Sequence, residues 1–192
     1  MTEGEFEDFG QQIADAAEVF LIGLEAVSRE EAGDAAVPLL LLEVSQLLLA
    51  GARLGAQQDF ETVTEYQPDV GPDPDLDLLR LRLAATLGEV DTYSHNFEPY
   101  DPETFTSNLS DDLAAIAADI ANGLRHFRTG NIDEALWWWQ YSYLANWGSL
   151  ACGVLSALHS VIAHDRLDRD FEGEEEQVEA AEAVLGTAGE AS

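Results

Sequence analysis

The hydrophobic positions of this chain recur at helical spacing from its beginning. Apolar side chains at residues 13, 16, 20, 24 and 27 define one face of a first helix over residues 8–28. A second helix is predicted over residues 34–55. Most positions between Pro38 and Leu49 are apolar, so this helix is expected to be almost entirely buried. Leucines at positions 76, 79, 83 and 87 predict a third helix that ends at Gly88.

Two further helices are predicted in the second half of the chain. Ser110, followed by two aspartates, indicates the capped start of a fourth helix whose apolar stripe continues to residue 127. A tight turn at residues 129–131 leads into a fifth helix, residues 133–164, which holds all four Trp residues. So short a turn makes the two helices antiparallel. Residues 57–75 and 98–108 are predicted to be loops and residues 90–97 a short aromatic helix or turn, and no strand pattern competes.

These patterns predict an all-α fold, an antiparallel bundle of about five helices around a long central Trp-rich helix. A single helical domain is expected over residues 1–169, followed by an acidic tail over residues 170–192 that is expected to be mobile. The junction over residues 123–136 resembles the helix-turn-helix junction of a tetratricopeptide repeat. No second copy follows at the period of that repeat, so a repeat array is not predicted.

The charge of the chain is strongly one-sided. It contains 38 Asp and Glu residues, 8 Arg residues and no Lys, and its formal net charge is -30. Nucleic-acid affinity depends on Lys and Arg contacts with phosphates, and anionic membranes repel acidic chains. We therefore expect no nucleic-acid binding and no membrane association, and we interpret the acidic shell as solvating. A basic protein partner is compatible with this charge.

One stretch, residues 135–158, contains no charged side chain and is long enough to be considered as a membrane span. Its polar residues, among them Gln140 and Asn146, and its flanks of mixed charge favour a buried central helix instead. The acidic N-terminus differs from a secretory signal. The single cysteine, Cys152, is expected to be buried and excludes an intrachain disulfide. We therefore expect a cytoplasmic protein.

The Trp block provides the main candidate for a binding site. Consecutive helical positions point about 100° apart, so the three consecutive Trp residues cannot share one face, and at least one should reach a cleft or the surface. Trp147 is expected to belong to the core. A stripe of small residues at positions 142, 145, 149, 152 and 156 is expected to receive the second helix. The predicted aromatic groove is lined by Trp137, Trp138, Trp139, Gln140, Tyr143 and Asn146, opposite Glu43 and Gln46.

Glu43 is the most suggestive acid because it lies among leucines in the second helix. We expect it to be buried and paired with Arg53, Arg125 or Tyr143, since an unpaired buried carboxylate is unfavourable. Removing one partner of a buried pair destabilises a protein by about 3 kcal/mol or more. The alternative is that Glu43 is an acid or base in a cleft with Tyr143 and Gln140.

Three functions remain open at this stage, because the sequence holds no nucleophile elbow, phosphate loop or Cys cluster. The four histidines are not spaced as helical metal ligands, so neither a metal nor a cofactor is expected. The leading hypothesis is a non-enzymatic helical interaction module whose aromatic groove receives a peptide, a helix or a second copy of the chain. The alternatives are a small-molecule enzyme that uses Glu43 and an acidic decoy of a nucleic-acid-binding protein.

Two blocks of sequence carry a further resemblance. They are VPLLLLEVSQLLLAG at residues 37–51 and ALWWWQYSYLANWG at residues 135–148. Together they resemble an uncharacterised bacterial family, domain of unknown function 5063, over residues 9–166. The resemblance implies an intracellular helical protein, and it implies no reaction, substrate or catalytic residue.

Overall fold

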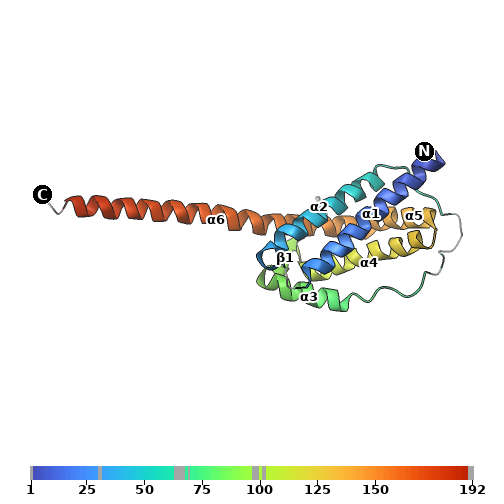
Figure 1. The fold of residues 1–192 in the computed structure, drawn as a ribbon, viewed down its shortest axis with the longest axis horizontal. Coiled ribbons are helices and arrows are strands. Elements are labelled where there is room, and N and C mark those ends of the chain that lie inside the picture. The colour runs from blue at the N-terminus through green and yellow to red at the C-terminus, as the bar shows by residue number, and fades with distance from the viewer. Residues whose placement is uncertain are drawn as a thin grey trace. The chain divides into compact units, whose positions relative to one another are not determined.

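Figure 1 shows the computed structural model of the protein, which describes residues 2–29, 32–62, 68, 70–96, 100 and 103–189, with side chains described up to residue 168. The chain divides into two compact units, Met1–Leu158 and His159–Ser192. The first unit contains the helix bundle, and the second contains the C-terminal part of helix α6. The predicted domain boundary after residue 169 stays a prediction.

Helices make up most of the described chain. The first half contains α1 (Glu3–Val27), the 3-10 turn η1 (Gly33–Ala35), α2 (Ala36–Gly55), α3 (Asp77–Leu87) and the 3-10 turn η2 (Gly88–Asp91). The second half contains α4 (Leu109–Arg128), α5 (Ile132–Ser142), the π-helical segment η3 (Tyr143–Trp147) and α6 (Gly148–Gly189). The predicted all-α bundle is confirmed, although the long central helix is interrupted by the π-helical segment.

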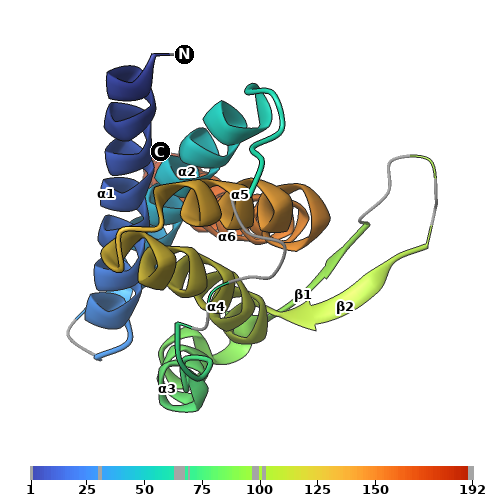
Figure 2. The same cartoon turned by 90° about the vertical axis from the view of Figure 1, so that its right-hand side faces the viewer.

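Helices α1, α2, α4 and α5 pack around a common apolar core. Figure 2 shows the arrangement of these helices, viewed nearly along α5. Fully buried side chains come from each of these helices, among them Phe20, Leu24, Leu40, Leu54, Leu113, Ile116, Ile120 and Leu136. Helix α3 adds three of the four leucines that predicted it, Leu79, Leu83 and Leu87. Burial of one such side chain contributes about 1.5–3 kcal/mol, so packing stabilises the bundle more than helix propensity does.

Helix α2 is less buried than its sequence predicts. Leu40, Val44 and Leu47 face the core, whereas Leu42 is 51% exposed and Leu49 is 66% exposed. A helix that is apolar on all sides gives no sequence signal for the side that its neighbours cover. Part of its apolar surface therefore stays uncovered in the bundle.

The contact between α2 and the Trp-rich helix differs from the prediction. The small side chains at positions 145, 149, 152 and 156, Cys152 among them, are exposed and do not receive α2. Instead, Gly51 of α2 packs against the rings of Tyr143 and Trp147, and Gly55 packs against Tyr143. The small residues that permit a close approach belong to α2, so large side chains of the Trp-rich helix fill this interface.

A β-hairpin follows η2, where the sequence analysis predicts an aromatic turn and a loop. Strand β1 (Thr92–His95) pairs antiparallel with β2 (Phe105–Asn108), and Tyr93 lies opposite Ser107. Each strand has four residues. The alternation of apolar and polar residues over so short a segment does not distinguish a strand from a turn. The prediction without strands is wrong here, and residues 97–99 and 101–102 lie outside the described residues.

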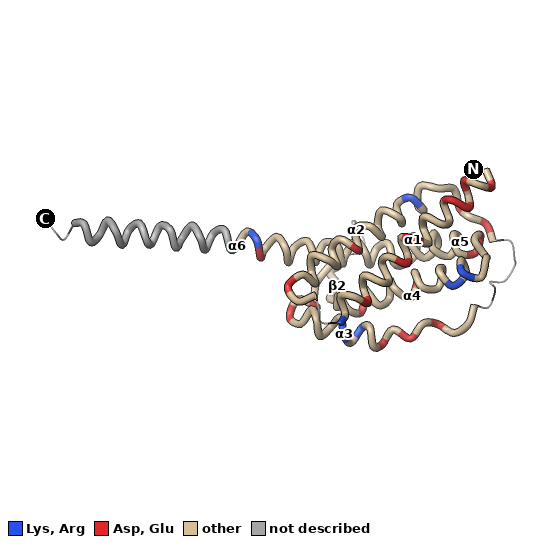
Figure 3. Tube along the Cα trace, in the orientation of Figure 1, with Lys and Arg blue, Asp and Glu red and all other residues tan. Residues whose placement is uncertain are grey.

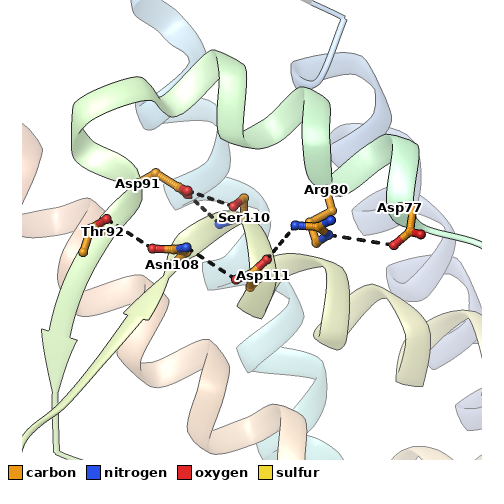
Figure 4. A network of polar contacts seen from close by, with 7 residues as sticks. All are labelled: Asp77, Arg80, Asp91, Thr92, Asn108, Ser110 and Asp111. Atoms are coloured by element: carbon orange, nitrogen blue, oxygen red, sulfur yellow. Dashed lines mark hydrogen bonds and ion pairs between the residues drawn. The ribbon is translucent and has the colours of Figure 1, made fainter.

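An aspartate of η2 stabilises the start of α4, where the sequence analysis gives the capping role to Ser110. Asp91 accepts hydrogen bonds from the backbone N–H of Ser110 at 2.8 Å and from its hydroxyl at 2.9 Å (Figure 4). In the same region, Arg80 of α3 forms ion pairs with Asp77 at 3.9 Å and Asp111 at 3.2 Å. These contacts join α3 and η2 to α4, and they place negative charge at the positive end of α4.

Candidate functional site

Two of the four Trp residues belong to the core. Trp139 is 0% exposed and Trp147 is 1% exposed. Their indole N–H groups donate to the backbone oxygens of Ile120 at 3.1 Å and Trp139 at 3.3 Å, respectively. Gly123 of α4 lies so close to the Trp139 indole that a Cβ at this position would overlap the ring. The prediction that Trp147 is a core residue is confirmed.

Trp137, Tyr141 and Leu144 form an exposed stripe that we call the aromatic ridge. The rings of Trp137 and Tyr141 stack with their centroids 5.2 Å apart and their planes inclined by 3°. Tyr141 is 54% exposed, Leu144 is 65% exposed and Trp137 is half-buried. Spacings of four and three residues place the three side chains on one side of the helix. Trp137 is thus the member of the Trp block that lies among exposed apolar groups.

Trp138 lies on the side of the ridge that faces α4. Its indole N–H donates to the backbone oxygen of Asp119 at 2.9 Å, and the amide of Asn146 donates to the Asp119 carboxylate at 2.8 Å. Partial burial raises the pKa of Asp119 above its ordinary value, and the bond from Asn146 opposes this increase. Asn146, a predicted lining residue, therefore binds an acid beside the ridge.

Gln140 attaches the loop after α2 to the other side of α5. Its buried side-chain amide accepts a bond from the N–H of Phe60 at 2.9 Å and donates to the backbone oxygen of Leu54 at 2.9 Å. Both ends of the amide are therefore engaged in structural contacts. The same loop carries Asp59 and Glu61, both exposed, so Gln140 attaches a loop with two acids to α5.

Several carboxylates lie on α5 or on the elements that contact it. Asp119 lies on the α4 side, the loop held by Gln140 carries two acids, and Asp133 precedes Trp137 by one helical turn. Figure 3 shows acidic residues along α1, α4 and the loop before α3, with few basic residues among them. Residues 135–158 contain no charged side chain. The ridge is consequently a neutral, partly aromatic stripe on an acidic surface.

Glu43 and Gln46 lie apart from the ridge. The Glu43 carboxylate packs against Gly23 of α1, where a Cβ would lie 2.5 Å from Glu43 Cδ, and Gln46 is exposed. Tyr143, which the prediction places opposite Glu43, packs instead against Gly51. The structure thus separates the eight predicted lining residues into ridge, core and α1–α2 positions.

The predicted pairing of Glu43 is wrong. Arg53 donates to Gln12 at 2.6 Å, and Arg125 binds backbone oxygens of the loop before α3 and Asp73 at 3.5 Å. Glu43 is half-buried, and its Oε2 is buried without a hydrogen-bond partner. Partial burial raises the pKa of Glu43 above its ordinary value. The arginines that could neutralise it bind other groups because the bundle places them far along the helices from position 43.

The sequence analysis misses a polar cluster at the base of the hairpin. The hydroxyl of Tyr93 donates to the buried Asp112 carboxylate at 2.8 Å, and the ring centroids of Tyr93 and His95 are 4.9 Å apart. Gly153 of α6 packs against both rings. Burial and the adjacent carboxylate raise the pKa of Tyr93 far above its ordinary value. The cluster joins the hairpin to α4. No sequence signal predicts the cluster, because strand β1 is itself too short to be predicted.

An open cleft of about 500 Å³ lies between α1 and α4. Its lining contains the apolar residues Leu21, Ile22, Ala26 and Leu124 and the charged residues Glu18, Glu25, Arg29 and Arg128. Arg128 pairs with Glu18 at 2.8 Å and Arg29 pairs with Glu25 at 3.1 Å. Because its own carboxylates neutralise these arginines, the cleft offers no excess positive charge to an anionic ligand.

Two stretches, Gly33–Gly55 and Ile132–Asp168, are long and apolar enough to cross a membrane by length and composition. Core helices meet the same criterion, and these stretches contribute the fully buried Leu40 and Trp139 to the bundle. Within the ranges that the structure describes, no group of three or more His, Cys, Asp or Glu residues is arranged to hold a metal ion.

The fold and its surfaces define an acidic helical bundle with an exposed aromatic ridge. The chain belongs to the family described as Domain of unknown function (DUF5063), whose model matches residues 4–164, so the predicted family resemblance is confirmed. It is also similar to protein BF1032 from Bacteroides fragilis, with 24% identity, coverage of 78% of this chain and 89% of that chain, and a TM-score of 0.63. That likeness shows the fold alone. None of the curated proteins compared with the chain matches it.

Proposed function

We propose that the protein is a non-enzymatic helical interaction module whose aromatic ridge binds a basic, amphipathic helical segment of a protein partner. The contrast between the ridge and its surroundings carries this proposal. Tyr141 is 54% exposed and Leu144 is 65% exposed on a chain with a net charge of -30. Contiguous exposed apolar groups that include Trp and Tyr are typical of binding surfaces.

The shape of the ridge suits a helical partner. Trp137, Tyr141 and Leu144 follow one another along about two helical turns, the spacing at which a docked helix presents its own apolar side chains. Stacked rings supply rigid contact area, since each ring side chain has only two rotatable angles. The exposed small residues Ala145 and Ser149 lie next along the helix and let a partner backbone approach.

The carboxylates around the ridge favour a basic partner. A helix with Lys or Arg on both sides of an apolar stripe places cations near Asp59, Glu61, Asp119 and Asp133, which accelerates association and improves specificity. A second copy of this chain would bring a further net charge of -30, so electrostatic repulsion opposes self-association. The same repulsion opposes nucleic acid and anionic membranes.

The other two functions have less support. An enzyme that uses Glu43 with Tyr143 and Gln140 requires these side chains to meet, whereas Glu43 packs against α1, Tyr143 packs against Gly51 and Gly55, and Gln140 is engaged in fixing a loop. A decoy of a nucleic-acid-binding protein requires carboxylates on rigid elements, whereas many acids of this chain lie in loops and in the C-terminal region. The cytoplasmic location stays a prediction.

Calorimetric titration with designed peptides tests the proposal. The probe is a helical peptide of about 18 residues, or about five turns, with a leucine stripe bordered by lysines. A second peptide replaces the lysines by glutamates, and a third scrambles the lysine peptide so that its charge is kept and its stripe is lost. We expect binding of the first peptide alone, with an affinity that falls as salt is added.

Matched surface variants locate the binding site. The double variant Tyr141→Ser/Leu144→Ser should weaken binding by about tenfold or more, since each lost factor of ten corresponds to about 1.4 kcal/mol. The control is Leu78→Ser/Leu81→Ser on α3, where the leucines are 59% and 57% exposed and binding should not change. Equal effects of the two double variants, or equal binding of the scrambled peptide, would refute the proposal.

A further inference from the structure

Helices α1 and α2 leave apolar side chains uncovered. These are Val19 at 49%, Ile22 at 68%, Leu39 at 41% and Leu42 at 51% exposed, and Ile22 also borders the cleft between α1 and α4. The two helices are antiparallel neighbours that meet where Gly23 packs against Glu43. Together with Glu43, these four apolar residues are called the α1–α2 face below.

Glu43 lies at the centre of this face. Val19 precedes Gly23 by one helical turn, and Leu39 precedes Glu43 by one turn. Because Gly23 has no side chain, the Glu43 carboxylate rests directly against α1, with Oε1 at 2.8 Å from the place that a Cβ would occupy. Its other oxygen, Oε2, is buried and has no hydrogen-bond partner. An unsatisfied acceptor of this kind destabilises the folded state, and the half-buried carboxylate is the group that a donor from outside the bundle can reach.

The described arginines nearby bind other groups. Arg29 and Arg82 both pair with Glu25, at 3.1 Å and 3.4 Å. Arg53 donates to a glutamine of α1 and lies over the ring of Phe9, at 5.3 Å from its centroid. Among the residues that the structure describes, Glu43 therefore forms no ion pair with an arginine, and the chain contains only 8 Lys and Arg residues.

We propose that the α1–α2 face is a second docking surface, and that it receives a partner helix whose apolar stripe contains one Lys or Arg directed at Glu43. The exposed apolar side chains of α1 and α2 supply apolar contact, and the unpaired carboxylate supplies the position that selects a cation. A charge-assisted hydrogen bond formed away from water is stronger than one at an open surface. This surface is independent of the aromatic ridge, which lies on α5 and η3 and binds cations only along its border.

The chemistry of the face distinguishes this partner from two other occupants. A second copy of the chain contains no Lys and would bring its own unpaired Glu43 and a net charge of -30, which repels. A membrane surface would have to cover a carboxylate in the middle of the apolar contact, which is unfavourable without a cation. A helix with an apolar stripe and a single central cation covers the apolar side chains of the face and also pairs with Glu43.

A charge-swap experiment on the full chain tests the proposal. The probes are three synthetic helical peptides with the same leucine stripe and neutral polar faces, which differ only in a central Lys, Met or Glu. We expect the wild-type protein to bind the Lys peptide about tenfold more tightly than the Met peptide. Glu43→Gln should remove most of this preference, and Glu43→Lys should shift the preference to the Glu peptide. Leu39→Ser/Leu42→Ser should weaken the binding of all three peptides.

Controls separate this site from general attraction and from the ridge. Glu7→Gln removes an exposed acid from α1 and should leave the preference for Lys unchanged. Tyr141→Ser/Leu144→Ser should also leave it unchanged, and circular dichroism should show that each variant is folded. A Lys preference that survives in Glu43→Gln would overturn the proposal. So would sedimentation with phosphatidylcholine vesicles that is lost in Leu39→Ser/Leu42→Ser, because the face would then be a membrane-binding surface.

Discussion

Replacing Glu43 by glutamine should stabilise the folded protein at neutral pH. A paired Glu43 would give the opposite result, because its substitution would leave the charge of the partner unpaired. In the structure, Glu43 packs against Gly23, and its Oε2 is buried without a partner. The substitution keeps the shape of the side chain and removes a charge that the protein does not neutralise.

The size of the effect follows from the burial of one carboxylate oxygen. A buried polar group without a partner destabilises the folded state by about 1–3 kcal/mol, and a charged one by more. Because Gln removes the charge but keeps two polar atoms at a half-buried position, the expected gain lies near the lower limit. A change of about 1 kcal/mol raises the melting temperature by about 2–4 °C in a protein of this length. Glu43→Met, which removes the polar atoms as well, should stabilise at least as much.

The pH dependence provides an independent check. Burial raises the pKa of Glu43 in the folded protein above the ordinary value of 4.5, so the folded state takes up the proton first as the pH falls. The difference in the free energy of unfolding between Glu43→Gln and wild type is therefore largest at pH values above the pKa of Glu43 in the folded protein. It disappears below about pH 4.5. Urea unfolding from pH 4 to pH 8 measures it, with Glu7→Gln as the control for loss of one charge. A destabilised Glu43→Gln at pH 7, or a difference that does not depend on pH, would refute the reasoning.

Four further predictions concern stability and are measured by urea unfolding. Trp147→Ala should lose about 3–5 kcal/mol because the indole is 1% exposed, whereas Trp137→Ala should lose much less. Gly123→Ala should destabilise by about 1–3 kcal/mol through overlap with the neighbouring indole. Asp91→Ala should cost about 1–3 kcal/mol because it leaves two buried donors unpaired. Burial lowers the pKa of His126 below 6.5, so the free energy of unfolding should fall as the pH falls through about 6.5, and His126→Gln should remove this dependence.

Regular spacing of apolar residues is what made the helices predictable. The leucines at 79, 83 and 87 lie on the buried side of α3, and the turn at residues 129–131 joins two antiparallel helices as predicted. These features depend on residues close to one another in sequence. The hairpin could not be predicted, since β1 and β2 have four residues each and their pairing depends on contacts across the chain.

The candidate site was predictable only in part. The angular spread of three consecutive Trp residues indicates that one of them reaches the surface, but the identity of that residue depends on Gly123, which admits Trp139 to the core. The surroundings of Glu43 depend on α1, which sequence spacing does not relate to α2. Uniform apolarity in α2 predicted burial and gave no information about the side that stays open.

Exposure of an apolar residue is by itself weak evidence for binding, because most folded proteins expose some leucines. Leu78 and Leu81 of α3 are as exposed as Tyr141, and we assign them no function. The two proposed surfaces differ from α3 in what surrounds the apolar groups. The ridge has stacked rings within a border of acids, and the α1–α2 face has a carboxylate with a buried, unpaired oxygen. Both surfaces combine apolar contact with negative charge, so both select partners that carry apolar groups next to cations, and Leu78→Ser/Leu81→Ser is the control that separates this chemistry from exposure alone.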